Sequence, residues 1–471
     1  MQTFTELTSL SACEAVDKLK RGEISPLELI DAVEQRVAQV DPTVNALPTR
    51  CFERARDHAR RLLAKPIAER GMLAGLPLPI KDLTDVAGVR TTYGSPIYKD
   101  HVPNESDIVV KTIERQGGVV FAKSAVPEFG AGGNTFNEVF GTTLNPWDRS
   151  RSASGSSGGA AVALATGMAW VAHGNDMGGS LRNPASFCGV VGLRPSPGRV
   201  ARNPGVLVDS LLGVEGPMAR TIADTALLFD AMCGENPADP LSLPRLGEHF
   251  LDAARQPQRP TRIAFSADLG ITPVDPEVAA ICRRAVERLA ATGVVVEETH
   301  PDLSEAHDVF QTLRALQYAA SHAQKLRDFP DLLKPEMIWN VKKGQELRAD
   351  EIIEAHAKRA ELIARTVAFF ETFELLLTPA TIVAPFPVEE RYVEECAGQS
   401  FGSYIDWLAI AYAVTLTTAP ALSMPCGFTS AGLPVGLQVI ARPRDEMRLL
   451  SHAAFIEAEL QAALAQPMNP R

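Results

Sequence analysis

The sequence predicts an α/β protein, because segments typical of strands alternate with segments typical of helices. Residues 107–125, "DIVVKTIERQGGVVFAKSA", have the pattern of a helix, a glycine turn and a buried strand at Val119–Ala122. Residues 275–300, "DPEVAAICRRAVERLAATGVVVEETH", repeat this order. Alternation of this kind is typical of a largely parallel sheet with helices packed on it.

The first 65 residues are predicted to be a helical N-terminal portion. In "SACEAVDKLKRG", the apolar residues fall on one helix face and Gly22 ends the segment. In "SPLELIDAVEQRVAQVD", Ser25 has the position of an N-cap and Pro26 the first helical position. The alternating charges of "TRCFERARDHARRLLAK" predict a solvated helix.

The remaining segments extend the same pattern to the end of the chain. Proline and glycine in "LAGLPLPIKDLTDVAG" predict strand ends and loops. Helical patterns at 305–328 and 349–373 precede the strand-like "FELLLTPAT", and "LPVGLQVIARP" followed by "DEMRLLSHAAFIEAELQAAL" predicts a last strand and a closing helix. No repeat, low-complexity segment or long linker divides the sequence. We therefore predict a single domain over residues 1–471 that includes the helical portion 1–65.

Composition and charge exclude several classes of function. The chain has 471 residues, a formal net charge of −11 and a pI near 5.4, which argues against nucleic-acid binding through a basic surface. Its seven cysteines never form a C-x-x-C pair, so neither a disulfide framework nor a structural zinc site is predicted. No signal peptide and no run of about 18 apolar residues is found, which predicts a cytoplasmic protein without a membrane segment. Nine scattered histidines include no H-E-x-x-H motif, and we expect neither metal nor cofactor.

Two segments rich in glycine and serine stand out. In "HGNDMGGSLRNPAS", Gly178 and Gly179 come directly before Ser180, and a glycine pair lets another group approach the backbone N–H groups closely. In "SRSASGSSGGAAVALATG", a serine and glycine cluster leads directly into an alanine-rich helix. The free N–H groups at a helix start can hold an anion or an oxyanion. Taken alone, each segment is also typical of a flexible loop.

Lys81 lies at the end of an apolar stretch, "LPLPIK". Burial disfavours the charged form and can lower the pKa of a lysine by about 3–5. A neutral lysine can accept a proton from a serine, as in the Ser–Lys variants of the catalytic triad. Taken alone, the position fits better a lysine at a strand end whose ammonium group reaches solvent.

Together these segments resemble the amidase signature family. Its hallmark is G-S-S-G-G, then D-x-G-G-S-[IL]-R-x-P-A, with a lysine well upstream, and here these are "GSSGG" (155–159), "DMGGSLRNPAS" (176–186) and "PIKD" (79–82). The segments "FGTTLNPWD", "FCGVVGLRPSPGRV" and "TTAPALSMPCGFTSAGLPVGLQVIA" also fit the family's pattern. The resemblance covers residues 5–460 and is most specific between 140 and 200. It implies a single large α/β domain with a mixed central β-sheet that helices cover on both faces.

The resemblance also implies an amidase that cleaves a carboxylic amide through an acyl-enzyme intermediate. Matched position by position, Ser180 is the acylated nucleophile. Ser156, which family members hold on a non-proline cis peptide bond, relays the proton. Lys81 is the general base and acid at the end of this relay.

The loop before Ser180 has two further roles by the same comparison. The backbone N–H groups of Met177, Gly178 and Gly179 are expected to form the oxyanion hole, where each donor typically contributes about 3–4 kcal/mol to transition-state stabilisation. Asp176 and Arg182 are expected to brace the loop and not to react.

A few positions near the site need a separate interpretation. Asn175 stands where many relatives carry Thr, and Ser154 where Gly is common. We expect neither to touch the three catalytic positions, although both lie near enough to alter substrate preference. Cys188 lies in the apolar "SFCGVVG" and is expected to be a buried, inert thiol. The family pattern gives His173 no role.

Three alternatives remain open from the sequence. "GSSGG" also fits G-x-S-x-G with Ser157 as the nucleophile of an α/β-hydrolase, but the preceding "NPWDRSRSAS" is not the strand that this motif requires, and Lys81 would then have no role. Some relatives are glutamine-hydrolysing subunits of a tRNA-dependent amidotransferase, and this sequence has no obvious docking segment for such a partner. A protein that keeps the fold without the chemistry is disfavoured, because all three catalytic positions are intact.

The substrate is the least defined part of the prediction. We expect the pocket walls at residues 128–136, 310–345 and 396–412, whose mostly apolar sequences include Phe, Tyr and Trp. These walls favour a small-molecule amide with a medium-sized apolar or aryl group over a small charged acid. Cleavage of esters or carbamates is compatible with acyl transfer to a serine. Nucleic acid and membrane are not expected partners, and the sequence leaves the oligomeric state open, a homodimer included.

Overall fold

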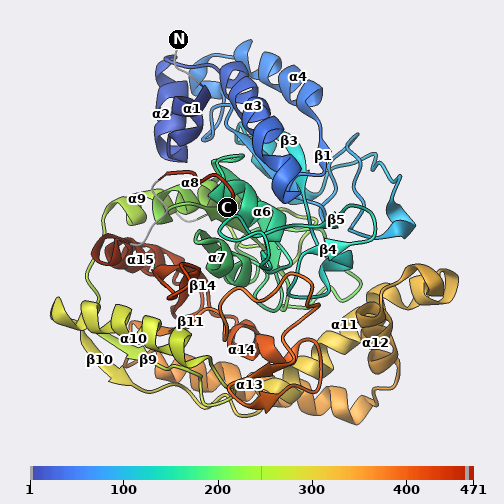
Figure 1. Cartoon of the computed structure of the whole chain (residues 1–471), viewed down its shortest axis with the longest axis vertical. Coiled ribbons are helices and arrows are strands. Elements are labelled where there is room, and N and C mark those ends of the chain that lie inside the picture. Colours follow the sequence, from blue (N-terminus) through green and yellow to red (C-terminus); the bar gives the residue numbers. More distant parts are fainter. Residues whose placement is uncertain (1–3, 246, 462–465) are drawn as a thin grey trace.

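The computed structural model describes residues 4–245, 247–461 and 466–471, and Figure 1 shows its elements. The helices are α1 (Phe4–Ser9), α2 (Ala12–Arg21), α3 (Pro26–Val44), α4 (Phe52–Leu63), α5 (Ile108–Arg115), α6 (Gly158–Ala165), α7 (Arg182–Cys188), α8 (Ile222–Met232), α9 (Phe250–Arg255), α10 (Pro276–Ala291), α11 (Ala306–Asp328), α12 (Pro335–Gln345), α13 (Ala349–Phe369), α14 (Ala409–Leu416) and α15 (Glu446–Leu460). The strands are β1 (Thr49–Arg50), β2 (Pro77–Lys81), β3 (Val119–Ser124), β4 (Phe136–Asn137), β5 (Gly141–Thr142), β6 (Val171–Asp176), β7 (Val191–Arg194), β8 (Val214–Ala219), β9 (Arg262–Phe265), β10 (Val295–Glu298), β11 (Leu375–Pro379), β12 (Glu395–Cys396), β13 (Gln399–Ser400), β14 (Ala421–Phe428) and β15 (Pro434–Ile440).

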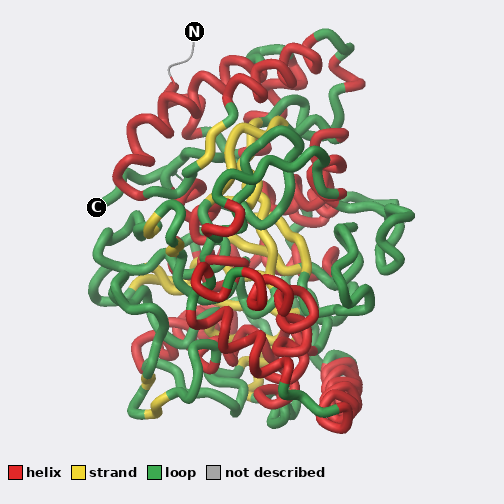
Figure 2. Tube along the Cα trace, turned by 90° about the vertical axis from the view of Figure 1, so that its right-hand side faces the viewer, coloured by secondary structure: helices red, strands yellow, loops and turns green. Residues whose placement is uncertain are grey.

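The central sheet is mixed. Within the described residues it has eight strands in the order β10-β9-β11-β15-β14-β7-β8-β6. The pairs β10–β9 and β9–β11 are parallel, and the remaining pairs are antiparallel. A second sheet has the order β1-β3-β2, and its strand β2 lies beside β6 of the central sheet. Figure 2 shows the strands running through the middle of the molecule with helices around them.

The prediction of a largely parallel sheet is wrong, whereas the mixed sheet that the family resemblance implies is confirmed. The two helix–strand units read from the sequence do give parallel pairs, β2 with β3 and β9 with β10. The antiparallel pairs arise elsewhere. A short turn joins β14 to β15 and makes them a hairpin. Helix α7 joins β6 to β7, and both strands pair with β8, which lies between them in the opposite direction.

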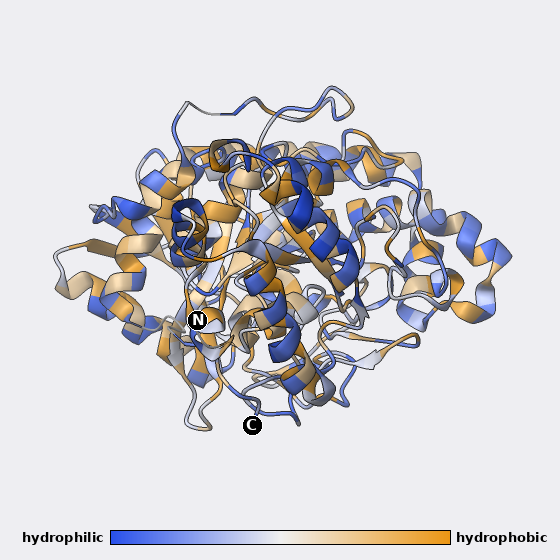
Figure 3. Ribbon diagram, turned by 90° about the horizontal axis from the view of Figure 1, so that it is seen from above, coloured by the Kyte–Doolittle hydropathy of each residue, from blue (hydrophilic) through white to orange (hydrophobic). Residues whose placement is uncertain are grey.

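Strand side chains alternate between two hydrophobic clusters, because successive residues of a strand point to opposite faces. On β9 and β11, Ile263 and Leu375 belong to the cluster that α10 and α15 complete. Their neighbours Ala264 and Leu376 belong to the cluster that α11, α13 and α14 complete. Helices therefore cover both faces of the sheet, as predicted. In Figure 3 many helices carry both hydrophilic and hydrophobic residues, as expected of helices with one face on the core and one in solvent.

The N-terminal helices begin where their caps predict. Ser11 and Ser25 each accept a hydrogen bond from the backbone N–H three residues later and form a capping box. Pro26 occupies the first turn of α3, and Gly22 ends α2 in the left-handed conformation, with φ +70°. The predicted third helix is α4, whose small buried face packs on β3.

The other predicted helices and strands are present with small differences at their ends. The strand-like "FELLLTPAT" and "LPVGLQVIARP" are β11 and β15, and the patterns at 305–328 and 349–373 are α11 and α13. The structure adds α7, α8, α9, α12 and α14, which were not predicted as helices. The closing helix α15 ends at Leu460, and the last part of that prediction, 462–464, lies outside the described residues. Of the helices in the described ranges, none has the length and apolar character that crossing a membrane requires.

Candidate active site

Lys81 is the last residue of β2, and its side chain is completely buried. Its Nζ atom lies 2.8 Å from Ser156 Oγ and 2.8 Å from Ser157 Oγ. It also donates to Asn175, at 2.7 Å from the side-chain Oδ1 and 3.2 Å from the backbone oxygen. The Lys81 amine at the end of this strand is therefore surrounded by four oxygen atoms of the protein and is shielded from bulk water.

This environment favours the neutral amine. Burial lowers the pKa of Lys81 from 10.5 to about 7, although the negative charges of Glu215 and Asp176 act in the opposite direction. The two oxygen atoms of Asn175 can only accept hydrogen bonds, so the N–H groups of the neutral amine point to them. The lone pair of the amine is then free to accept a hydrogen bond from a serine hydroxyl. A lysine in this state can act as a base near neutral pH.

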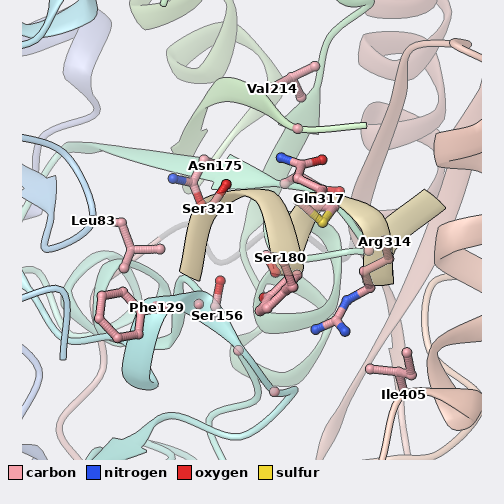
Figure 4. Close-up of a pocket in the computed structure, with 18 of the residues that line it drawn as sticks. Leu83, Phe129, Ser156, Asn175, Ser180, Val214, Arg314, Gln317, Ser321 and Ile405 are labelled. Atoms are coloured by element: carbon pink, nitrogen blue, oxygen red, sulfur yellow. The ribbon is translucent and has the colours of Figure 1, made fainter. Parts of the chain in front are cut away.

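The two serines beside Lys81 differ in their surroundings. Ser156 follows a cis peptide bond from Gly155, and both residues line a cavity (Figure 4). Ser157 has no exposed surface and precedes α6. Its backbone N–H donates to the backbone carbonyl oxygen of Ser180 at 3.2 Å. The α/β-hydrolase alternative is therefore not supported, because a nucleophile must reach substrate and because no strand leads into this loop.

Ser180 lies between β6 and α7 and lines the same cavity as Ser156 (Figure 4). The preceding Gly179 has φ +110°, a conformation that residues with a side chain rarely adopt. A Cβ atom at this position would lie 2.5 Å from Asn183 Oδ1 and 2.7 Å from Ala411 Cβ. Glycine is thus required at position 179 both for its backbone conformation and for the space around it.

Asp176 and Arg182 brace this loop, as the sequence predicts. The buried Asp176 carboxylate accepts hydrogen bonds from the Leu181 N–H at 3.0 Å and from Arg182 at 2.9 and 3.1 Å. Arg194 donates to the Asp176 backbone oxygen at 2.6 Å. Burial by itself would raise the pKa of Asp176, but Arg182 and Arg194 lower it well below its usual range. The carboxylate is therefore ionised and fully occupied with holding the loop.

The backbone N–H groups of the loop are not equivalent. The Gly179 N–H donates to Asp176 Oδ1 at 3.0 Å, which differs from the expectation that it is free for a substrate oxygen. Among the described residues, the N–H groups of Met177 and Gly178 donate to no protein acceptor. Both residues line the cavity next to Ser180. The structure therefore leaves two of the three predicted donors free.

His173 is buried on β6, and its ring is used on both sides. The Lys81 backbone N–H donates to Nδ1 at 3.4 Å, and Nε2 lies 2.8 Å from Glu215 Oε2. The first contact makes Nδ1 the acceptor, so Nε2 carries the hydrogen that Glu215 accepts. Glu215 lines the cavity and His173 does not. His173 thus supports the strand that carries Lys81.

The expectation that Asn175 touches none of the three catalytic positions is wrong, because Asn175 Oδ1 accepts directly from Lys81 Nζ. Asn175 follows His173 by two residues on β6, so their side chains point to the same side of the strand, and β2 lies beside it. Ser154 meets the expectation: its Oγ donates to the Gly133 oxygen at 3.2 Å, and its φ is +59°. Cys188 is completely buried, and burial raises the pKa of its thiol.

The cavity in front of Ser156 and Ser180 has a volume of about 230 Å³. It draws on all three segments predicted as walls. These contribute Phe129, Gly130 and Gly132 from the first, Phe310, Arg314, Gln317, Tyr318, Ser321 and His322 from the second, and Ile405 and Leu408 from the third. Leu83, Arg202 and residues 213–215 also line it and were not predicted.

The wall is more polar than its sequence suggests. Helix α11 faces the cavity with residues spaced three or four apart, which places them on one side of the helix. Figure 4 shows Arg314, Gln317 and Ser321 on this helix near Ser180. The spacing of three or four residues is present in the sequence and could have predicted that these polar residues share one face of the helix. Within the described part of the chain, no group of three or more His, Cys, Asp or Glu side chains is arranged to hold a metal ion.

Comparisons with known proteins agree on one family. The family model described as Amidase matches residues 28–450. The chain is 33% identical to an acylamidase of Rhodococcus erythropolis over 97% of its own length and 96% of the relative. It is 36% identical to a glutamyl-tRNA(Gln) amidotransferase subunit from Moorella thermoacetica, over 98% and 99% of the two chains.

Solved structures give the same result. A bacterial aryl acylamidase of the amidase signature family superposes with a TM-score of 0.88 and 27% identity, covering 96% of each chain. A 6-aminohexanoate cyclic dimer hydrolase in complex with substrate has a TM-score of 0.87 and 27% identity, covering 98% of this chain and 99% of the other. The corresponding glutamyl-tRNA(Gln) amidotransferase subunit from Thermotoga maritima has a TM-score of 0.76 and 25% identity, covering 100% of this chain and 97% of the other.

Proposed function

The chain belongs to the amidase signature family and is a C–N hydrolase, and we propose that Lys81, Ser156 and Ser180 carry out the hydrolysis of its amide substrate. One observation carries this assignment. The buried Lys81 amine lies 2.8 Å from Ser156 Oγ, and Ser156 shares a cavity wall with Ser180. We further propose that residues 1–65 belong to the same domain, since α2, α3 and α4 contribute to the main hydrophobic cluster.

In the first step the neutral Lys81 amine accepts the Ser156 hydroxyl proton while Ser156 Oγ takes the proton of Ser180. The Ser180 oxygen attacks the amide carbonyl carbon, and the carbonyl oxygen becomes negatively charged. The free N–H groups of Met177 and Gly178 are suited to this oxygen, and donors that meet it there are typically worth about 3–4 kcal/mol each.

The second step breaks the C–N bond. The proton held by Lys81 returns through Ser156 to the departing nitrogen, which leaves as an amine. The acyl group stays on Ser180 as an ester. Water then repeats the sequence with the same relay and releases the carboxylic acid. Acyl transfer to a serine does not require an amide leaving group, so esters and carbamates of suitable shape are expected substrates as well.

The cavity supports a medium-sized substrate. Phe129, Phe310, Tyr318 and Leu408 offer aromatic and aliphatic surface close to Ser180, which fits an aryl or alkyl group next to the scissile bond. The likeness to the aryl acylamidase structure points in the same direction.

Covalent labelling tests the assignment of the nucleophile. We expect a fluorophosphonate to label the wild-type protein and the Ser157→Ala variant but not the Ser180→Ala variant. Peptide mass spectrometry should map the adduct to Ser180. Loss of anilide hydrolysis should accompany loss of labelling. An adduct on Ser157 in the wild type would contradict the proposed triad and favour the α/β-hydrolase alternative.

The amidotransferase alternative keeps one observation in its favour, the 36% identity to the relative from Moorella thermoacetica. Structural similarity favours a free-standing amidase, because the TM-score is 0.88 to the aryl acylamidase and 0.76 to the solved amidotransferase structure. A panel of anilides, primary amides, glutamine and asparagine separates the two. Hydrolysis of glutamine and asparagine alone would favour the amidotransferase alternative.

A further inference from the structure

Arg314 is a buried cavity residue whose charge is not balanced by the described part of the chain. It lies on α11, only 5% of its surface is exposed, and it lines the cavity that holds Ser156 and Ser180 (Figure 4). A fully buried guanidinium normally has a carboxylate partner, because an unpaired buried charge loses most of its hydration. The partners of Arg314 are therefore informative.

Those partners are all neutral. Arg314 donates to Asn340 Oδ1 and, at 2.5 Å, to the Tyr404 hydroxyl, and its guanidinium lies 4.2 Å from the centre of the Tyr318 ring. Within the described residues, no carboxylate forms an ion pair with it. These contacts fix the orientation of the guanidinium but leave its positive charge uncompensated.

The acidic groups in the same cavity already have partners inside the protein. Glu215 accepts a hydrogen bond from His173 Nε2 at 2.8 Å, and Asp176 forms an ion pair with Arg182 at 2.9 Å. A second guanidinium, that of Arg202, also lines the cavity, and no acidic side chain in the described residues forms an ion pair with it. Two guanidinium groups of the cavity wall are thus without an ion-pair partner, and such charges attract anions in a cleft with low-dielectric walls.

We propose that the substrate of this enzyme carries a carboxylate, or a group of the same shape and charge, and that Arg314 binds it. The proposal rests on the proposed function, since it concerns the substrate of the same site. The planar guanidinium matches a carboxylate with two parallel hydrogen bonds. The aromatic wall around it retains the preference for a medium-sized group, so the substrate class is an aryl or alkyl amide with an acidic substituent.

The chemistry does not require the carboxylate on a particular side of the amide, and two substrate pairs cover both sides. On the amine side, 4-acetamidobenzoate is compared with 4-nitroacetanilide. On the acyl side, glutaryl anilide is compared with 4-nitrobutyryl anilide. In each pair a nitro group replaces the carboxylate with similar shape and no charge. The ratio of kcat/KM within a pair, compared between wild type and variant, cancels differences in leaving group.

In Arg314→Gln we expect the ratio of kcat/KM for the carboxylate substrate to kcat/KM for its nitro partner to fall about 10- to 100-fold in at least one pair. This is the range of a charge-assisted hydrogen bond, and kcat/KM for the nitro substrate should change little. Arg314→Lys should retain part of the preference. Glutamine keeps polar N–H donors without the charge, and labelling of Ser180 by a neutral fluorophosphonate reports whether each variant keeps an assembled site.

Failure of the inference and failure of the proposed function give different results. If Ser180 is labelled and neutral anilides are hydrolysed, but Arg314→Gln changes neither ratio or lowers all four substrates equally, the carboxylate assignment is wrong and the amidase mechanism stands. If wild-type Ser180 is not labelled and no anilide is cleaved, the proposed mechanism itself is wrong.

Discussion

Replacing Asn175 by aspartate should move the pH dependence of the enzyme without removing a catalytic group. Asn175 Oδ1 lies 2.7 Å from Lys81 Nζ, the shortest contact of the amine. An aspartate there puts a negative charge in contact with the base. A nearby opposite charge favours the protonated lysine, which is the form that cannot accept the Ser156 proton.

The size of the effect follows from the surroundings of Lys81. Its pKa is about 7 in the wild type, so about half of the enzyme is active at pH 7. A single opposite charge at this range raises a lysine pKa by about 1–3, to between about 8 and 10. At pH 7 the active fraction then falls to between about 9% and about 0.1%, a loss of about 5- to 500-fold.

The assay is the pH profile of kcat/KM from pH 5.5 to 10 with a chromogenic anilide. The wild-type rate should rise about tenfold between pH 6 and pH 8 and then level off, because the neutral lysine must accumulate first. In Asn175→Asp the rise should shift to higher pH; with a pKa of about 8 it reaches a similar plateau, and with a pKa of about 10 it still rises at the end of this range. Asn175→Thr, which keeps an uncharged acceptor, should retain the wild-type profile. Lys81→Arg should be inactive throughout, because a guanidinium stays protonated.

Two results would refute this reasoning. An Asn175→Asp profile that overlies the wild type would mean that Lys81 does not set the pH dependence. A wild-type profile governed by a group near pH 6.5, the usual pKa of histidine, that disappears in His173→Ala would transfer the role of the base to His173.

Two further predictions concern the glycine loop and the reaction. Gly179→Ala should abolish hydrolysis and lower the free energy of unfolding, as measured by chemical denaturation. The positive φ should cost about 1–2 kcal/mol, and crowding against Asn183 and Ala411 about 1–3 kcal/mol more. The control Gly432→Ala, at φ +78° with open space around it, measures the cost of the positive φ alone, so an equal loss of stability in both variants would contradict the crowding argument. Treatment with a chelator should leave anilide hydrolysis unchanged, and loss of activity that zinc restores would show that a metal takes part.

Local signals in the sequence predicted the N-terminal helices well. The N-cap serines and the terminal glycine of α2 act within one turn of the chain, so their effect does not depend on the rest of the fold. The family resemblance predicted that Lys81 acts with Ser156, which lies 75 residues later in the sequence. In the structure, Lys81 Nζ lies 2.8 Å from Ser156 Oγ.

The errors concern relations between distant segments. The direction of strands depends on how the chain returns to the sheet, and the spacing of strands and helices in the sequence does not contain this information for β6, β7 and β8. Asn175 was judged by its neighbours in the sequence, whereas its contact with Lys81 arises because β2 lies beside β6. The occupied Gly179 N–H was missed for the same reason, since the turn that brings it to Asp176 exists only in the folded loop.

The buried charges of the site fall into two groups with different partners. Asp176 and Glu215 have cationic or hydrogen-bonding partners inside the protein, and Lys81 has oxygen partners and a pKa low enough to lose its charge. Each of these arrangements limits the cost of burial without a ligand. Arg314 cannot lose its proton in the accessible pH range, so the same relief is not open to it. A substrate anion is the partner that completes its environment, and binding it would recover interaction energy that the empty site lacks. The charge that the protein leaves unpaired is therefore the one that selects the substrate, while the paired charges hold the machinery that cleaves it.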